Sequence, residues 1–179
     1  DKRMFITQKK AKRNSEAYEG AYVKDPQVGL HKWVMSFDLN SLYPHLIMQY
    51  NISPDTLIDG SVRDISIEDV VDKNVTTPKD KVLAANGQYF RKDKKGFLTE
   101  MMQSMYEDRV IYKKKMIQAQ KELQKTKSKE LEKDIAKYSN MQLAKKVQLN
   151  SAYGALGNQY FRFYDIRQAL AITKSGQLS

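Results

Sequence analysis

The sequence predicts an α+β fold that is mainly helical, with a long antiparallel helical hairpin as its main feature. Residues 97–158 contain no proline and no glycine before Gly154, and apolar residues recur there at intervals of three and four. The polar stretch KTKSKE at 125–130 lacks apolar anchors, so we place a turn near Ser128 and expect two long helices. One continuous coiled-coil helix over the same residues is the alternative.

The segments before this hairpin are shorter and less regular. Residues 1–32 are polar and basic, which predicts an arm or linker. Residues 33–39, WVMSFDL, alternate with a period of two and predict a strand that ends near Asp38. A short helix is expected from Ser41 onward, with a proline in its first turn. Residues 55–96 have no clear period and predict loops with short strands.

Composition limits the class of protein. The 179 residues are 41% hydrophobic, enough for one ordinary core. The net charge of +10 suits a partner of nucleic acid or of an anionic surface, although a solvated basic surface explains it equally well. Cysteine is absent, which excludes disulfides and thiolate metal sites. No apolar run reaches the roughly 18 residues that a membrane span needs.

Asp38 lies where a strand is expected to end and a helix to begin. A carboxylate at such a place can hold Mg²⁺, and the free N–H groups of Ser41, Leu42 and Tyr43 at the helix start can bind phosphate oxygens. An aspartate at the end of a strand is also a common cap or surface residue. Position alone therefore does not establish a metal site.

Basic residues recur at helical spacing on both halves of the predicted hairpin. Arg109 and Lys113 share one face, and Lys146, Asn150 and Tyr153 form a stripe on the second helix. The midpoint between positions 109 and 146 is 127.5, where the turn is expected, so Arg109 and Lys146 should lie level with each other. Cations near a flat aromatic side chain suit a nucleoside triphosphate. The solvated face of a hairpin explains the same spacing.

Four segments have the order and spacing of known sequence motifs. The segments DLNSLYP at 38–44 and KKVQLNSAYGALGN at 145–158 resemble motifs A and B of the family B DNA polymerases. YEGA at 18–21 is similar to the Tyr-x-Gly-Gly/Ala element near the template strand. FRFYDIRQALAIT at 161–173 resembles the sequence that follows motif B in T-even bacteriophage members. The similarity covers nearly the whole chain.

The resemblance implies a DNA-directed DNA polymerase that uses two Mg²⁺ ions, a DNA template-primer and dNTPs. Asp38 would ligate both ions, and the Leu39 carbonyl would bind the ion that travels with the nucleotide. Tyr43 would be a steric gate against the 2′-hydroxyl of ribonucleotides. The implied contacts with the nucleotide are those of Ser41, Leu42, Tyr43, Arg109, Lys113, Lys146 and Asn150. The implied contacts with DNA and the nascent base pair are those of Tyr18, Gly20, Tyr153 and Gly154.

The resemblance also divides the chain into parts of a polymerase. Residues 1–32 would be an arm with the YEGA element, 33–96 part of the palm, 97–158 the fingers hairpin, and 159–179 a return to the palm. His45 replaces a small polar residue of the phage relatives and is expected to face solvent. The family's Asp-Thr-Asp-Ser motif does not occur in this sequence. The motif, thumb and exonuclease are therefore expected on the same or a second chain, and this chain alone should be inactive.

Further partners follow from the same resemblance. A sliding clamp would be contacted through other polymerase regions, and the site of action would be the cytoplasm of an infected bacterial host, with no membrane partner. The alternative from another class is a non-enzymatic basic helical module that binds nucleic acid or a partner helix. Such a module explains the charge and the hairpin but not the order of residues in the motifs. Specific binding of dNTPs distinguishes the two hypotheses.

Overall fold

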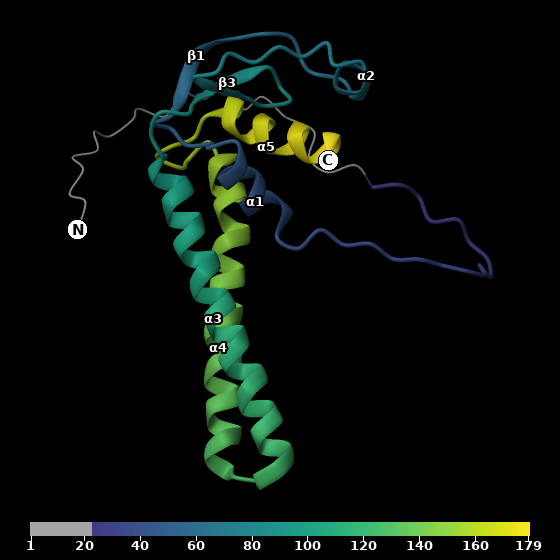
Figure 1. The fold of residues 1–179 in the computed structure, drawn as a ribbon, viewed down its shortest axis with the longest axis vertical. Coiled ribbons are helices and arrows are strands. Elements are labelled where there is room, and N and C mark those ends of the chain that lie inside the picture. The colour runs from purple at the N-terminus through teal and green to yellow at the C-terminus, as the bar shows by residue number, and fades with distance from the viewer. Residues whose placement is uncertain (1–22) are drawn as a thin grey trace.

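The computed structural model describes residues 23–179, and a long helical hairpin projects from a small α+β body (Figure 1). The helices and strands are α1 (Leu42–Gln49), β1 (Leu57–Ser61), α2 (Ile67–Val71), β2 (Lys81–Leu83), β3 (Gln88–Arg91), α3 (Phe97–Thr126), α4 (Lys129–Leu156) and α5 (Ile166–Leu178). A mainly helical chain with one small antiparallel sheet confirms the predicted α+β class. None of the described helices is long and apolar enough to cross a membrane.

The hairpin consists of α3 and α4, which lie side by side along its length (Figure 1). α3 ends at Thr126, Lys127 turns the chain with a left-handed φ of 43°, and α4 begins after Ser128. The Ser128 hydroxyl accepts a hydrogen bond from the Glu130 N–H and so caps α4 where the turn is expected. The predicted two-helix hairpin is confirmed, and the alternative of one continuous helix is wrong.

Polar side chains connect the two helices away from the body. The Lys145 ammonium lies 2.8 Å from the Asp108 carboxylate across the helix pair. Further out, the Lys115 ammonium lies 5.7 Å from the centre of the Tyr138 ring. Surface pairs of this kind contribute at most about 1 kcal/mol each. These polar pairs by themselves therefore add little to the stability of the hairpin.

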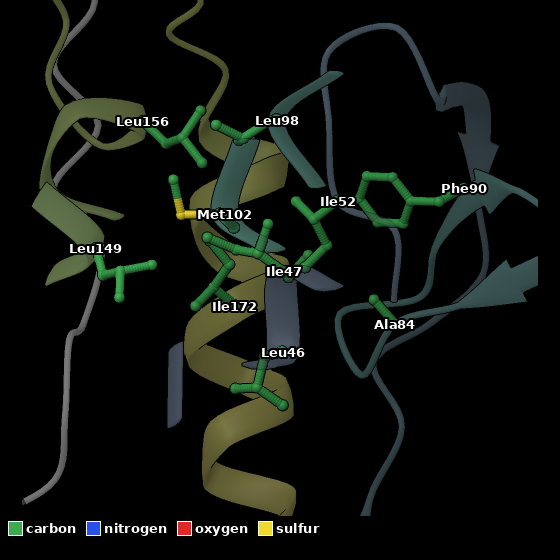
Figure 2. Close-up of a cluster of buried hydrophobic side chains, with 11 residues drawn as sticks. Leu46, Ile47, Ile52, Ala84, Phe90, Leu98, Met102, Leu149, Leu156 and Ile172 are labelled. Carbon is green, nitrogen blue, oxygen red and sulfur yellow. The ribbon is translucent and has the colours of Figure 1, made fainter. Parts of the chain in front are cut away.

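The main hydrophobic core lies at the base of the hairpin, where α1 packs against α3, α4 and α5 (Figure 2). Its large buried side chains are Leu46, Ile47, Ile52, Phe90, Leu98, Met102, Leu149, Leu156 and Ile172. Burial of one such side chain contributes about 1.5–3 kcal/mol, more than a surface pair of the hairpin. The core therefore fixes the lower ends of α3 and α4 against α1.

Residues 55–96 form the small sheet, in the order β1-β3-β2 with antiparallel neighbours. The predicted short strands are confirmed, but the short helix α2 was not expected. Ser66 caps this helix, because its hydroxyl accepts from the Asp69 N–H while the Asp69 carboxylate accepts from the Ser66 N–H. Hydrogen bonds from the Arg63 guanidinium hold the pKa of Asp69 far below its ordinary value, so this carboxylate stays charged.

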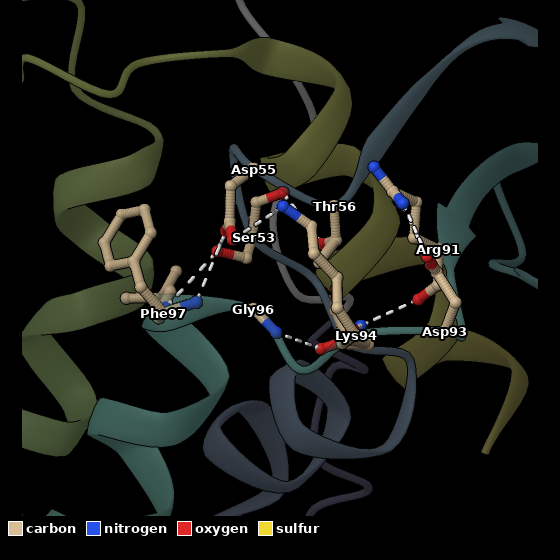
Figure 3. A network of polar contacts seen from close by, with 10 residues as sticks. Ser53, Asp55, Thr56, Arg91, Asp93, Lys94, Gly96 and Phe97 are labelled. Carbon is tan, nitrogen blue, oxygen red and sulfur yellow. Dashed lines mark hydrogen bonds and ion pairs between the residues drawn. The ribbon is translucent and has the colours of Figure 1, made fainter.

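The start of α3 is attached to the loop that follows α1 (Figure 3). The N–H groups of residues 96–98 donate to Asn51 Oδ1, Asp55 Oδ1 and Ser53 Oγ at 2.9, 3.3 and 3.3 Å, respectively. Partial burial raises the pKa of Asp55, but hydrogen bonds from the Ser53 hydroxyl and the Phe97 N–H outweigh it and lower that pKa. The charged carboxylate also suits the positive end of the helix dipole. These bonds orient the hairpin at its root.

The strand predicted over residues 33–39 is not formed. This segment is irregular and exposed, and its largest apolar side chains, Trp33 and Phe37, are 98% and 87% exposed. A strand needs a neighbour for its backbone N–H and C=O groups, and the described sheet contains only β1, β2 and β3. The prediction is wrong because alternation describes a side-chain pattern, whereas a strand also requires a pairing partner.

Alanine substitutions at two glycines with positive φ test how closely the sheet packs on the loop after β1. A Cβ at Gly87, where φ is +74°, would collide with the Val62 carbonyl oxygen, whereas a Cβ at Gly60, where φ is +97°, would meet nothing within 4 Å. We expect Gly87→Ala to lower the free energy of unfolding by about 3 kcal/mol or more, and Gly60→Ala by about 1 kcal/mol, since only the first adds a collision to backbone strain. Urea unfolding monitored by circular dichroism measures both, and equal losses would contradict the expected packing.

Candidate active site

A pocket of about 710 Å³ lies beside the first turn of α1 and brings the two motif segments together. Its lining consists of Phe37, Asp38, Leu39, Ser41, Leu42, Tyr43, Pro44, Asn150 and Tyr153. Residues 37–44 and the end of α4 are far apart in the sequence. They share one pocket because the core packs the C-terminal part of α4 against α1.

The first turn of α1 presents hydrogen-bond donors beside this pocket. Ser41 precedes the helix with a left-handed φ of 54°, and its side chain makes no capping hydrogen bond to the helix. The first N–H groups of an α-helix have no partner within the helix and carry partial positive charge. Asp38 and Leu39 lie just before this turn on an exposed segment. The pocket therefore combines donors suited to an anion with oxygen atoms suited to a cation.

Arg109 connects α3 to the start of α1. Its Nη1 donates to the Ser41 hydroxyl oxygen at 2.9 Å. Its Nε is buried and has no hydrogen-bond partner among the described residues. Arg109 itself does not line the pocket. The guanidinium thus brings a positive charge next to the start of α1.

Tyr43 and Tyr153 form an aromatic contact at the pocket. Their ring centres are 4.6 Å apart and the ring planes are inclined at 52°. Tilted arrangements of this kind are favourable contacts between aromatic rings. Asn150 lies one turn before Tyr153 on α4 and adds an amide group to the lining. The predicted stripe on α4 therefore reaches the pocket through these two residues.

The two predicted lysines of the hairpin do not line the pocket. Lys113 and Lys146 are exposed. The ion pair between Asp108 and Lys145 shows that the residues next to them, Arg109 and Lys146, lie at nearly the same level of the hairpin. That level agrees with the midpoint argument from the sequence. Convergence of the three cations on one ligand stays a prediction.

Some predicted site residues lie elsewhere, and one lining residue was not predicted. Gly154 is exposed on α4 and is not part of the pocket lining. Tyr18 and Gly20 lie outside the described residues. Phe37 lines the pocket, although the alternating pattern predicts for it only a place on one face of a strand. Its position directly before Asp38 in the sequence is the signal that could identify it as a residue of the pocket.

The His45 side chain is less exposed than the sequence predicts. The sequence predicts a solvent-facing side chain, whereas the ring is half-buried and meets the Tyr106 ring edge-on at 4.7 Å between centres. Its Nδ1 lies 2.9 Å from the Ser41 carbonyl oxygen. The prediction is wrong because α3 covers this side of α1, which helical position alone does not reveal.

The residues that line the pocket fall within a match to a known protein family. The sequence model of DNA polymerase family B matches residues 1–178. The match includes both segments that line the pocket. The chain belongs to DNA polymerase family B.

Individual relatives come from bacteriophages and archaea. The chain is 32% identical to the DNA-directed DNA polymerase of Escherichia phage RB69, over 92% of the chain and 23% of that protein. It is 29% identical to the DNA-directed DNA polymerase of Enterobacteria phage T4, over 91% of the chain and 23% of that protein. It also resembles the structure of the family B DNA polymerase of Pyrobaculum calidifontis, with a TM-score of 0.62 and 30% identity, over 93% of the chain and 19% of that protein. The chain thus spans less than a quarter of these relatives.

Proposed function

We propose that this chain supplies the nucleotide-binding part of a DNA-directed DNA polymerase, which adds deoxynucleotides to a primer 3′-hydroxyl on a DNA template. The observation that carries this proposal is the pocket that combines Asp38 and Tyr43 with Asn150 and Tyr153. Membership of the family supports it, and so do the phage relatives, which are named DNA-directed DNA polymerases.

In this proposal, the helical hairpin forms the fingers and the body forms part of the palm. Residues 97–158 would be the fingers, and 33–96 together with 159–179 would belong to the palm. The base of the hairpin lies in the core of the body, while its outer part projects from it (Figure 1). This arrangement suits an element that carries cations at the edge of a pocket in the palm.

Asp38 and the Leu39 carbonyl are the groups that would hold Mg²⁺. Their oxygen atoms match the preference of this cation, and both residues line the pocket on an exposed segment. When bound, a pair of such ions would stabilise the attacking and leaving oxygens of nucleotidyl transfer. The protein side chains would bind and orient the nucleotide.

The triphosphate would lie at the start of α1. The backbone N–H groups of residues 41–43 would donate to phosphate oxygens, as helix N-termini do for anions. Arg109 would add a charge-assisted hydrogen bond from its guanidinium, which already reaches the Ser41 hydroxyl at the helix start. Lys113 and Lys146 would contribute charge from the exposed faces of the hairpin.

The sugar and the base would lie toward the aromatic pair. Tyr43 would place its ring beneath the sugar and leave no room for a 2′-hydroxyl, and the Tyr153 ring beside it would limit its movement. Asn150 would lie at the phosphate and sugar side of the nucleotide. The remaining proposed contacts, with DNA and the nascent base pair, are those of Tyr18, Gly20, Tyr153 and Gly154.

The proposed partners are the template-primer, dNTPs and the remaining polymerase regions. Those regions would supply a second catalytic carboxylate, the thumb and the exonuclease, on the same or a second chain. Contact with a sliding clamp would also run through them. The phage relatives support a site of action in the cytoplasm of an infected bacterial host.

Nucleotide affinity tests the placement of Arg109. We expect Arg109→Ala to weaken binding of Mg²⁺-dATP by about tenfold or more, because a charge-assisted hydrogen bond contributes about 1.5–3 kcal/mol. Lys125→Ala is the matched control, since it removes the same charge from the last turn of α3. It should change the affinity by less than about twofold, because salt screens distant charges. Titration calorimetry measures both, and equal losses would favour the non-enzymatic basic module.

Sugar selection tests the role of Tyr43 in a polymerase that contains these residues and the remaining regions. We expect Tyr43→Ala to raise the efficiency of ribonucleotide incorporation by about tenfold or more, because removing the ring removes a steric penalty. Deoxynucleotide incorporation should change far less. Single-nucleotide extension with dATP and ATP opposite a template thymine gives both efficiencies. Unchanged discrimination would show that Tyr43 is not the gate.

Primer extension tests how much of the catalytic site these residues contain. Among the described residues that line the pocket, Asp38 alone is acidic. A Mg²⁺ ion held by one carboxylate must complete its octahedron with water and substrate phosphates. We therefore expect no primer extension by the isolated 179-residue chain with Mg²⁺ and four dNTPs. Extension that disappears in Asp38→Ala would refute this expectation, and extension that persists would indicate a contaminating polymerase.

A further inference from the structure

Gly176 lies on α5 directly against the ring of Tyr43. A Cβ added to this glycine would lie 3.3 Å from Tyr43 Cε1, closer than most Cβ contacts in proteins. It would lie 3.5 Å from Leu46 Cδ1 and 3.8 Å from Leu42 Cδ2, which are ordinary van der Waals distances. The aromatic ring is therefore the neighbour that a side chain at position 176 would crowd.

The backbone does not explain the glycine. Gly176 lies inside α5, and its φ is not in the left-handed region. Alanine is a much better helix former than glycine at such a position. Alanine would therefore stabilise α5 at this position, yet the residue is glycine. The only tight contact of an added methyl group would be with the Tyr43 ring.

Tyr43 is confined from two directions. The Tyr153 ring on α4 lies 4.6 Å away between ring centres, and the backbone of α5 at Gly176 lies against the edge of the Tyr43 ring. Packed side chains transmit small volume changes because protein interiors contain little free space. The position of the Tyr43 ring therefore depends on the volume at residue 176.

We propose that Gly176 is a positioning residue for sugar selection, because its lack of a side chain sets how far the Tyr43 ring can withdraw from the nucleotide. This inference rests on the proposed function of Tyr43 as the gate. A methyl group at position 176 would push the ring by a few tenths of an ångström away from α5. The ring would then leave less room beneath the sugar, so a 2′-hydroxyl would be penalised more strongly.

The test measures selectivity in a complete polymerase that contains these residues. For the unmodified protein, Gly176→Ala, Tyr43→Ala and the double variant, kcat/KM is determined for dATP and for ATP opposite a template thymine. Gly176→Ala should raise the ratio of deoxynucleotide to ribonucleotide efficiency by about threefold, less than a methylene in direct contact with a substrate achieves. In the Tyr43→Ala background, the same substitution should leave the ratio unchanged, because the crowded ring is absent.

The four proteins separate the failure of this inference from the failure of the proposed gate. If Tyr43→Ala does not alter the ratio, Tyr43 is not the gate, and the inference falls with it. If Tyr43→Ala lowers the ratio but Gly176→Ala leaves it unchanged or lowers it, the gate stands and the role of Gly176 is overturned. An equal change in both backgrounds also overturns that role. If Gly176→Ala misfolds and the added Tyr43→Ala substitution restores folding, the contact between the two residues is supported. If Gly176→Ala misfolds in both backgrounds, the proposed role of Gly176 is overturned.

Discussion

The burial of α1 at the base of the hairpin is the constraint on which the rest of the structure depends. This helix has eight residues, and an isolated helix of that length is unstable in water. Its position is therefore set by Leu46 and Ile47, which are enclosed by side chains of α3, α4 and α5 (Figure 2). The same packing brings the first turn of α1 next to Asn150 and Tyr153. Stability and the pocket thus come from one set of contacts.

The side chains of α3 become less buried within a few turns of this core. Met102 is fully buried and Met105 packs against the core, whereas Arg109, one turn further along α3, reaches the start of α1 with its guanidinium. At this level the polar pair of Asp108 and Lys145 joins the two helices, and further along α3 Ala119 is buried again. Arg109 therefore lies just outside the hydrophobic core, and its hydrogen bond to Ser41 holds its cation beside the pocket.

Some elements of this fold follow from local sequence patterns, whereas others depend on a segment far away in the chain. The hairpin turn could be predicted because Ser128 and the polar residues around it act locally, through a cap and the absence of apolar anchors. The strand over residues 33–39 could not be predicted reliably, because pairing depends on a second segment. His45 was misassigned for a related reason, since burial of a helix face depends on what packs against it.

The sequence by itself determined the mainly helical class, the two-helix hairpin and the family, because helical periodicity, turn chemistry and motif order are properties of the chain. It also selected Asp38, Tyr43, Asn150 and Tyr153 as candidates. Only the tertiary structure decided that these residues share one pocket and that Gly176 lies against Tyr43. Such contacts join positions far apart in the chain, and they depend on how helices pack in three dimensions rather than on local sequence.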